Sequence, residues 1–138
     1  MIKKILFFLL VCMSLIANDY NDGIKFYKAK DFENASKCFI KAANDGDLES
    51  AYILGFFYTG GTGVKMDLNE ALNWYEKAAS GGHINAQVNL GWAYIGGQGV
   101  KSDYEKGAYW IKKAKDAGSA QAKQLWLQFE LEKYYKGK

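Results

Sequence analysis

The chain has 138 residues, a length typical of one compact domain, and 49% of them are hydrophobic, enough to form a core. It contains no proline, which all-β and loop-rich folds usually use and which helix interiors exclude. The formal net charge is only +3 and every basic residue is a lysine, so the guanidinium groups and the basic stripe favoured by nucleic-acid sites are absent. These features argue against nucleic-acid binding.

The first 17 residues have the pattern of a secretory signal peptide. Lys3 and Lys4 give a charged start, residues 5–16 form an apolar stretch, and Ala17 is a small residue before the expected cut. The apolar stretch is shorter than the ~20 residues that a membrane-spanning helix needs. We therefore expect cleavage and a mature chain of residues 18–138 that is periplasmic or secreted and not membrane-bound. An uncleaved anchor is the alternative.

Two cysteines limit the covalent framework. Cys12 lies in the predicted signal peptide, so the mature chain keeps Cys38 alone and has no internal disulfide. We expect Cys38 to be a small core residue, because free cysteine is often buried. A reactive thiol or an intermolecular disulfide is the alternative.

An internal repeat with a period of 36 residues determines the expected fold. Leu54, Gly55, Tyr58, the glycines of the 60–63 stretch and Trp74 all recur 36 positions later. Half of an earlier copy precedes them without the glycine-rich loop. We expect repeat units at residues 18–46, 47–82 and 83–118, followed by a capping helix at residues 119–136.

Each unit has the pattern of two helices joined by a loop. Apolar residues from Ala51 to Tyr58 recur at spacings of three and four, which places them on one helix face. The glycines of residues 60–63 end this helix, because glycine adopts left-handed backbone angles at little cost. Asp67 is expected to cap the second helix, with Glu70 completing a capping box. Helix pairs of this size must stack to bury their apolar faces, which predicts an all-α, right-handed α-solenoid of about seven helices.

The string A-x-x-x-L-G-x-x-Y-x-G-G-x-G-V-x-x-D, seen from Ala86, and the string W-Y-x-K-A-A-x-x-G, seen from Trp74, resemble the Sel-one-like repeat. That family is related to the tetratricopeptide repeat and has a longer loop between its helices. The resemblance extends over residues 18–121. It implies an α-solenoid whose first helices line a concave groove.

The groove positions implied by the resemblance form an aromatic and apolar stripe. Counted from Gly55 and Gly91, they are Tyr20, Ile24, Tyr27, Tyr52, Phe56, Val88, Trp92, Gln124 and Gln128. Aromatic anchors are typical of interaction hot spots, and an extended peptide or a helix could lie across them. We therefore expect an exported adaptor for a protein or peptide partner, with no cofactor. The alternative is that these side chains pack between helices or beneath the last helix.

The resemblance also offers a different function. A secreted, cysteine-rich bacterial branch of the family carries a disulfide in each repeat and is assigned β-lactam binding or hydrolysis. The corresponding positions here are Ala79 and Ala86, and the sequence has no S-x-x-K or G-x-S-x-G string to supply a nucleophile. A third possibility is a structural module that self-associates through the open ends of its solenoid.

Two further patterns have structural explanations. The glycine-rich loops lie between helices and continue into Val64 and Val100, whereas a phosphate-binding loop continues into lysine and serine or threonine. His83 is the single histidine and falls between two units. A metal site usually gathers several ligands at set spacings, so we expect a turn residue at His83 and no metal site.

Overall fold

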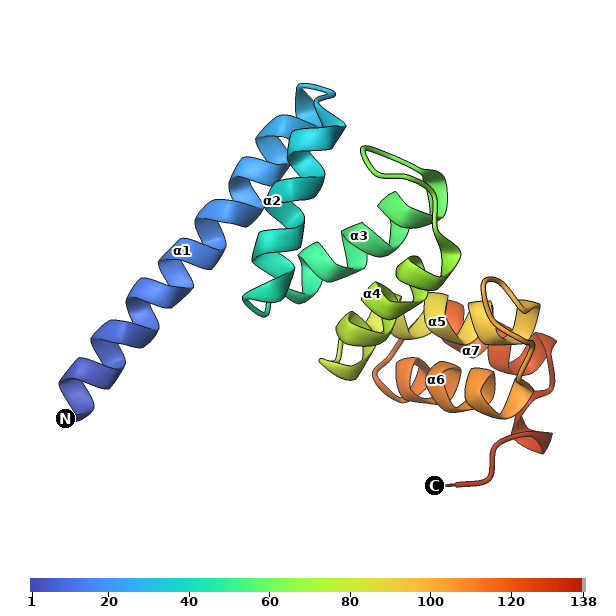
Figure 1. The fold of residues 1–138 in the computed structure, drawn as a ribbon. Coiled ribbons are helices and arrows are strands. Elements are labelled where there is room, and N and C mark those ends of the chain that lie inside the picture. Colours follow the sequence, from blue (N-terminus) through green and yellow to red (C-terminus); the bar gives the residue numbers. More distant parts are fainter. Residues whose placement is uncertain (138) are drawn as a thin grey trace.

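The chain is all-helical in the computed structural model, which describes the backbone of residues 1–137 and the side chains of residues 1–6 and 19–137. Seven α-helices and one short 3-10 helix follow one another in this part of the chain (Figure 1). They are α1 (Ile2–Lys28), α2 (Phe32–Asn44), α3 (Leu48–Gly60), α4 (Leu68–Ser80), α5 (Ile84–Gly96), α6 (Tyr104–Asp116), α7 (Ala120–Gln128) and the 3-10 helix η1 (Leu131–Lys133). The predicted helical fold is confirmed.

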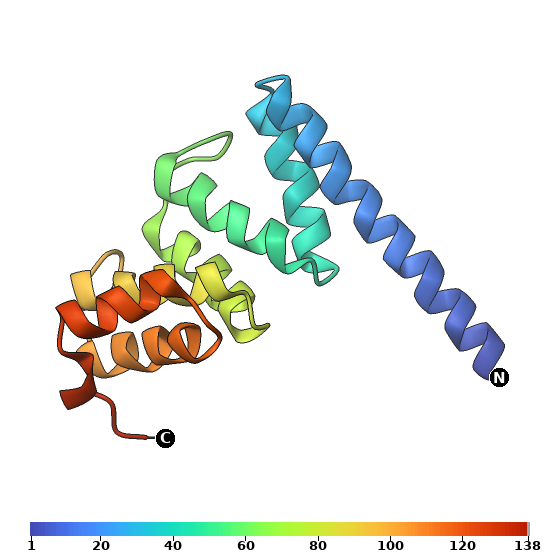
Figure 2. The same cartoon turned by 180° about the vertical axis from the view of Figure 1, so that it is seen from behind.

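The helices pack as pairs that follow one another along the chain. α1 packs on α2, α3 on α4 and α5 on α6, while α2 contacts α3, α4 contacts α5, and α6 contacts α7. Figures 1 and 2 show the pairs stepping from the N-terminal to the C-terminal label. Contacts made mainly between neighbouring elements are characteristic of a repeat solenoid.

The N-terminal half of α1 projects beyond α2 (Figure 2). α1 continues past the predicted cut after Ala17, so the signal-peptide boundary stays a prediction; cleavage there would leave residues 18–28 as the first helix. Most of the predicted apolar stretch, including Cys12, lies outside the residues with described side chains. Among the described residues, no helix is both long and apolar enough to cross a membrane.

A glycine on the first helix of each pair allows the second helix to come close. A Cβ atom added at Gly55 would lie 2.3 Å from a ring carbon of Tyr75, and one added at Gly91 would lie 2.7 Å from Ile111. Leu127 occupies the equivalent place in α7 and is 68% exposed. α7 therefore ends the described solenoid as an unpaired first helix.

In the loop between the two helices of a unit, the glycines have the predicted conformation, but the predicted capping box is incomplete. Gly61 and Gly97 end α3 and α5 with a φ of +66°. The Asp67 carboxylate accepts a hydrogen bond from the backbone N–H of Glu70 at 3.1 Å. The predicted capping box is wrong, because the Asp67 N–H donates to the Tyr58 carbonyl at 2.9 Å and not to Glu70.

The C-terminal segment is not the single capping helix that we predicted. α7 ends at Gln128, and Glu130 turns the chain with a φ of +49°. This reversal buries Leu131 completely and lets the Trp126 indole N–H donate to Glu132 at 3.1 Å. A continuous helix would carry Leu131 away from the core, so tertiary burial overrides local helix propensity here.

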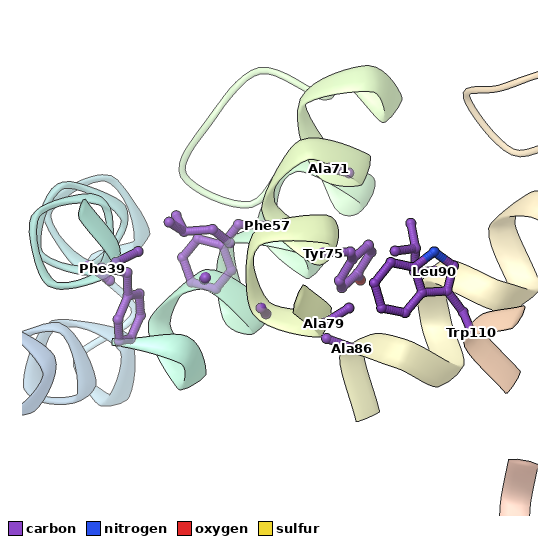
Figure 3. Close-up of a cluster of buried hydrophobic side chains, with 13 residues drawn as sticks. Phe39, Phe57, Ala71, Tyr75, Ala79, Ala86, Leu90 and Trp110 are labelled. Carbon is purple, nitrogen blue, oxygen red and sulfur yellow. The ribbon is translucent and has the colours of Figure 1, made fainter. Parts of the chain in front are cut away.

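Two clusters of buried side chains form the core. The first extends from α2 to α6 and includes Phe39, Phe57, Tyr75 and Trp110 (Figure 3). The second joins the last helices through Val88, Ile111, Trp126 and Leu131. Cys38 is a half-buried free thiol outside both clusters, which differs from the predicted core position.

Candidate interaction surface

The first of two hollows lies between α1 and α3 and is called the α1–α3 hollow. It has a volume of about 410 Å³, in the range of small-ligand and side-chain pockets. The rings of Phe39 and Phe57 pack edge to face at 5.7 Å, and Tyr27 lies 6.0 Å from Phe57. All the lining residues are uncharged: Ile24, Tyr27, Phe39, Ile53, Phe56, Phe57 and Thr62.

The second hollow, the α3–α5 hollow, has a volume of about 200 Å³. The Phe56 ring stands edge-on to the nearly buried Tyr75 ring at 5.8 Å. The hollow also has uncharged walls: Phe56, Thr59, Leu68, Ala71, Leu72, Tyr75, Asn89, Trp92, Ala93 and Gln98. A mainly apolar lining with a few polar groups is typical of recognition sites.

The phenols beside the α3–α5 hollow remain neutral around pH 7. Burial raises the pKa of Tyr75, and hydrogen bonding from Thr59 and Asn89 opposes this rise. Burial and the nearby Glu49 carboxylate raise the pKa of Tyr52, which Asn89 again opposes. Asn89 therefore supplies an amide group where the aromatic walls of α3 and α5 meet.

Phe56 joins the two hollows, because its ring belongs to both linings. It is 49% exposed, and Tyr27 and Trp92 are 48% and 39% exposed. With the half-buried Ile24 they form what we call the Phe56 surface. Contiguous exposed apolar side chains of this kind mark interaction sites more often than isolated ones do.

Apart from Val88, the structure places the other predicted groove residues in two different environments. Tyr20 and Tyr52 are both half-buried. Tyr20 lies 6.1 Å from Phe39, which lines the α1–α3 hollow, and Tyr52 lies 5.0 Å from Phe56. Gln124 and Gln128 are exposed on α7 and line neither hollow.

The prediction that Val88 faces the groove is wrong. Val88 is 1% exposed and packs in the second core cluster with Ile111 and Trp126. The groove-facing position on α5 is instead taken by the half-buried Asn89, one residue further along. Successive side chains point about 100° apart around a helix axis. This difference in direction places Val88 in the core and Asn89 at the groove.

Residues from the second helices also reach the surface, and sequence reasoning missed them. Leu68, Leu72 and Tyr75 on α4 line the α3–α5 hollow, and Phe39 on α2 lines the α1–α3 hollow. The resemblance predicts a groove lined by the first helices alone. The available signal was Gly55, because a glycine on α3 lets the facing α4 side chains come close.

His83 lies in the turn between two units, as predicted, and it also caps α5. Its Nδ1 accepts a hydrogen bond from the Ala86 N–H at 3.2 Å, and its Nε2 lies 2.9 Å from a Glu49 carboxylate oxygen. The ring stacks on Tyr52 at 4.4 Å. No group of three or more His, Cys, Asp or Glu side chains that could hold a metal occurs among the described residues.

Solved structures with related folds agree with this architecture. A Sel1 repeat protein from Oxalobacter formigenes is 31% identical with a TM-score of 0.70, over 77% of this chain and 42% of that chain. The protein c5321, a protective antigen of uropathogenic Escherichia coli with an SLR fold, is 34% identical with a TM-score of 0.76, over 79% and 24%. The chain thus spans less than half the length of either protein.

A third structure supports the fold alone. Helicobacter pylori cysteine rich protein B is 21% identical with a TM-score of 0.65, over 80% of this chain and 93% of that chain. No curated protein matches the chain. The Sel1 repeat pattern matches residues 12–47, 48–83 and 84–119, which together make up most of the sequence. The chain therefore belongs to the Sel1 repeat family.

Proposed function

We propose that this chain is an exported adaptor that holds a peptide segment of a protein partner on the Phe56 surface. Sel1 repeat proteins generally mediate protein–protein interaction. The observation that supports the surface is Phe56 itself, a half-exposed aromatic ring shared by two uncharged hollows. Aromatic residues of this kind supply most of the binding energy in many interfaces.

The chemistry of the two hollows indicates what the bound segment contains. Two apolar side chains of the segment, one for each hollow, would cover Phe56 from both sides. Asn89 can both donate and accept hydrogen bonds, so it suits a peptide backbone group passing over the α3–α5 hollow. The segment is therefore apolar at its two anchor positions and uncharged between them.

Selection from a displayed peptide library tests this proposal. Peptides enriched on the wild-type protein should carry two apolar anchors and should lose binding to the Phe56→Ala/Trp92→Ala variant. Leu127→Ala is the matched control, because Leu127 is 68% exposed and lines neither hollow. Equal binding to the wild type and the double variant, with unchanged circular dichroism, would place the interaction elsewhere.

Export is the second part of the proposal and depends on the N-terminal sequence. Lys3, Lys4, the apolar stretch and Ala17 support it. The protein recovered from the periplasm or medium of an expressing bacterium should begin at Asn18 when its mass is measured. An intact chain that begins at Met1 in the membrane fraction would favour the uncleaved anchor.

The β-lactam alternative receives no support from the described residues. Where the related branch has paired cysteines, this chain has Ala79 and Ala86. These alanines are 1% and 0% exposed and pack in the first core cluster (Figure 3). We therefore do not propose it.

A further inference from the structure

The cap of α5 differs chemically from the caps of the equivalent helices. The N-cap residues of α3, α5 and α7 are Asp47, His83 and Ser119. Each side chain accepts a hydrogen bond from the backbone N–H three residues later, at 2.8, 3.2 and 3.2 Å. Of these three side chains, only the histidine loses its acceptor atom when it takes up a proton.

The two hydrogen bonds of His83 define its neutral form. The Ala86 N–H can only donate, so Nδ1 of His83 carries no proton. Nε2 therefore carries the proton, and its N–H donates a hydrogen bond to the Glu49 carboxylate. A second proton has to go to Nδ1, where it would face the Ala86 N–H across the same 3.2 Å. Two donors cannot share a hydrogen bond, so protonation breaks the cap.

The surroundings of the ring offer little compensation for this loss. The charged or titratable groups facing His83 are Glu49 and Tyr52 on α3, while the α6–α7 turn contributes the non-titratable Gly118 and Ser119. Glu49 already accepts from the neutral ring and its side chain is 50% exposed, so the added attraction is weak. The positive end of the α5 dipole opposes a cation at this place.

The ring also connects the cap to the Phe56 surface. His83 stacks on Tyr52 at 4.4 Å with planes 25° apart, and Tyr52 packs on Phe56 at 5.0 Å. Reorientation of the His83 ring would remove one side of the Tyr52 packing. Phe56 would then lose a neighbour that holds its ring between the two hollows.

We infer that protonation of His83 uncaps α5 and frees Tyr52, so that mild acid loosens the contact between α3 and α5 beside the Phe56 surface. The claim that this change regulates partner binding rests on the proposed function. The claim that the free protein changes conformation in mild acid does not depend on it.

Amide hydrogen exchange of the purified full chain, without any ligand, tests the inference. The protection factor of the Ala86 amide, which corrects for the intrinsic effect of pH, should fall about fivefold between pH 7.5 and 5.5, the factor expected for loss of one N-cap. The Ser50 and Ala122 amides are internal controls, because Asp47 and Ser119 cap them. Their protection factors should change less than about twofold.

The matched variant is His83→Ser, which copies the cap found at Ser119. Its Ala86 amide should be equally protected at both pH values. Unchanged protection of Ala86 in the wild type would overturn the inference, and so would an equal loss in His83→Ser, which would assign the response to other groups.

The nitrogen chemical shifts of the single histidine give an independent check. At pH 7.5 they should show the Nε2–H form, and the Nδ1–H form would overturn the hydrogen-bond assignment. No partner takes part in these measurements, so their failure would leave the adaptor proposal unaffected. A failed peptide selection would equally leave this inference unaffected.

Discussion

Replacing Gly55 by alanine should destabilise the protein even though alanine is the better helix former. The added Cβ would lie 2.3, 2.4 and 2.6 Å from three ring carbons of Tyr75. Tyr75 is 6% exposed, and the rings of Tyr52 and Phe56 lie 6.1 and 5.8 Å away. The ring can therefore not simply rotate into open space, and either it or α4 has to shift.

Gly60→Ala is the control that isolates the cost of this overpacking. Gly60 is the last residue of α3, and its added Cβ would meet only the Thr62 hydroxyl oxygen at 3.4 Å. Alanine gains about 1 kcal/mol of helix propensity over glycine in a helix interior, and less at a helix end. Overpacking costs about 1–3 kcal/mol. We expect Gly55→Ala to be less stable than Gly60→Ala by about 1–2 kcal/mol after this difference is included.

Urea denaturation followed by circular dichroism measures both free energies of unfolding. A second experiment compares Tyr75→Ala with the double variant Gly55→Ala/Tyr75→Ala. Without the Tyr75 ring the clash is absent, so Gly55→Ala should not lower the free energy of unfolding further. Equal stability of Gly55→Ala and Gly60→Ala would refute the close approach of α3 and α4. A cost that persists without the Tyr75 ring would refute its assignment to that ring.

Three further predictions concern the rest of the chain. Leu131→Ala should lower the free energy of unfolding by about 2–5 kcal/mol, because Leu131 is fully buried; a loss below about 1 kcal/mol in urea denaturation would contradict the folded-back C-terminal segment. Asp67→Ala should cost about 1 kcal/mol in the same assay, because the carboxylate caps α4 through the Asn69 and Glu70 N–H groups; Asp67→Asn, which keeps an acceptor, should cost less. Burial, Asp22 and Asp19 raise the pKa of the Cys38 thiol, so the folded chain holds less thiolate at pH 8 than the unfolded chain does. The rate of alkylation at Cys38, measured from the mass of the modified peptide, should be lower in the folded chain than in the urea-unfolded chain. In the folded chain this rate should increase with pH, and it should be higher in Asp22→Asn. Equal rates in the folded and unfolded chains would contradict the raised pKa.

The 36-residue repeat predicted the helices well because equivalent residues make the same packing contacts in each unit. Gly55 and Gly91 occupy the same place, and both face a bulky side chain of the second helix. The same repeat explains why Gly61 and Gly97 end their helices with left-handed angles. Features shared by the units could therefore be derived from the sequence.

Features that belong to one unit could not be derived in this way. Val88 occupies the place of Tyr52, yet the last helices bury it while Tyr52 stays half-exposed. The end of α7 is determined by the burial of Leu131, a tertiary contact that leaves no local signal. His83 is recognisable as a turn residue, but its cap depends on a side-chain rotamer and on Glu49, which is 34 residues away in the chain.

The measurement that tests the account most directly is photo-crosslinking from position 56. A benzophenone analogue of phenylalanine at position 56, in the middle of the Phe56 surface, should form a covalent adduct with a partner protein in cells that make this chain. The same group at the exposed position 127 should form none. Adducts of equal yield from both positions, or from position 127 alone, would contradict binding at the Phe56 surface.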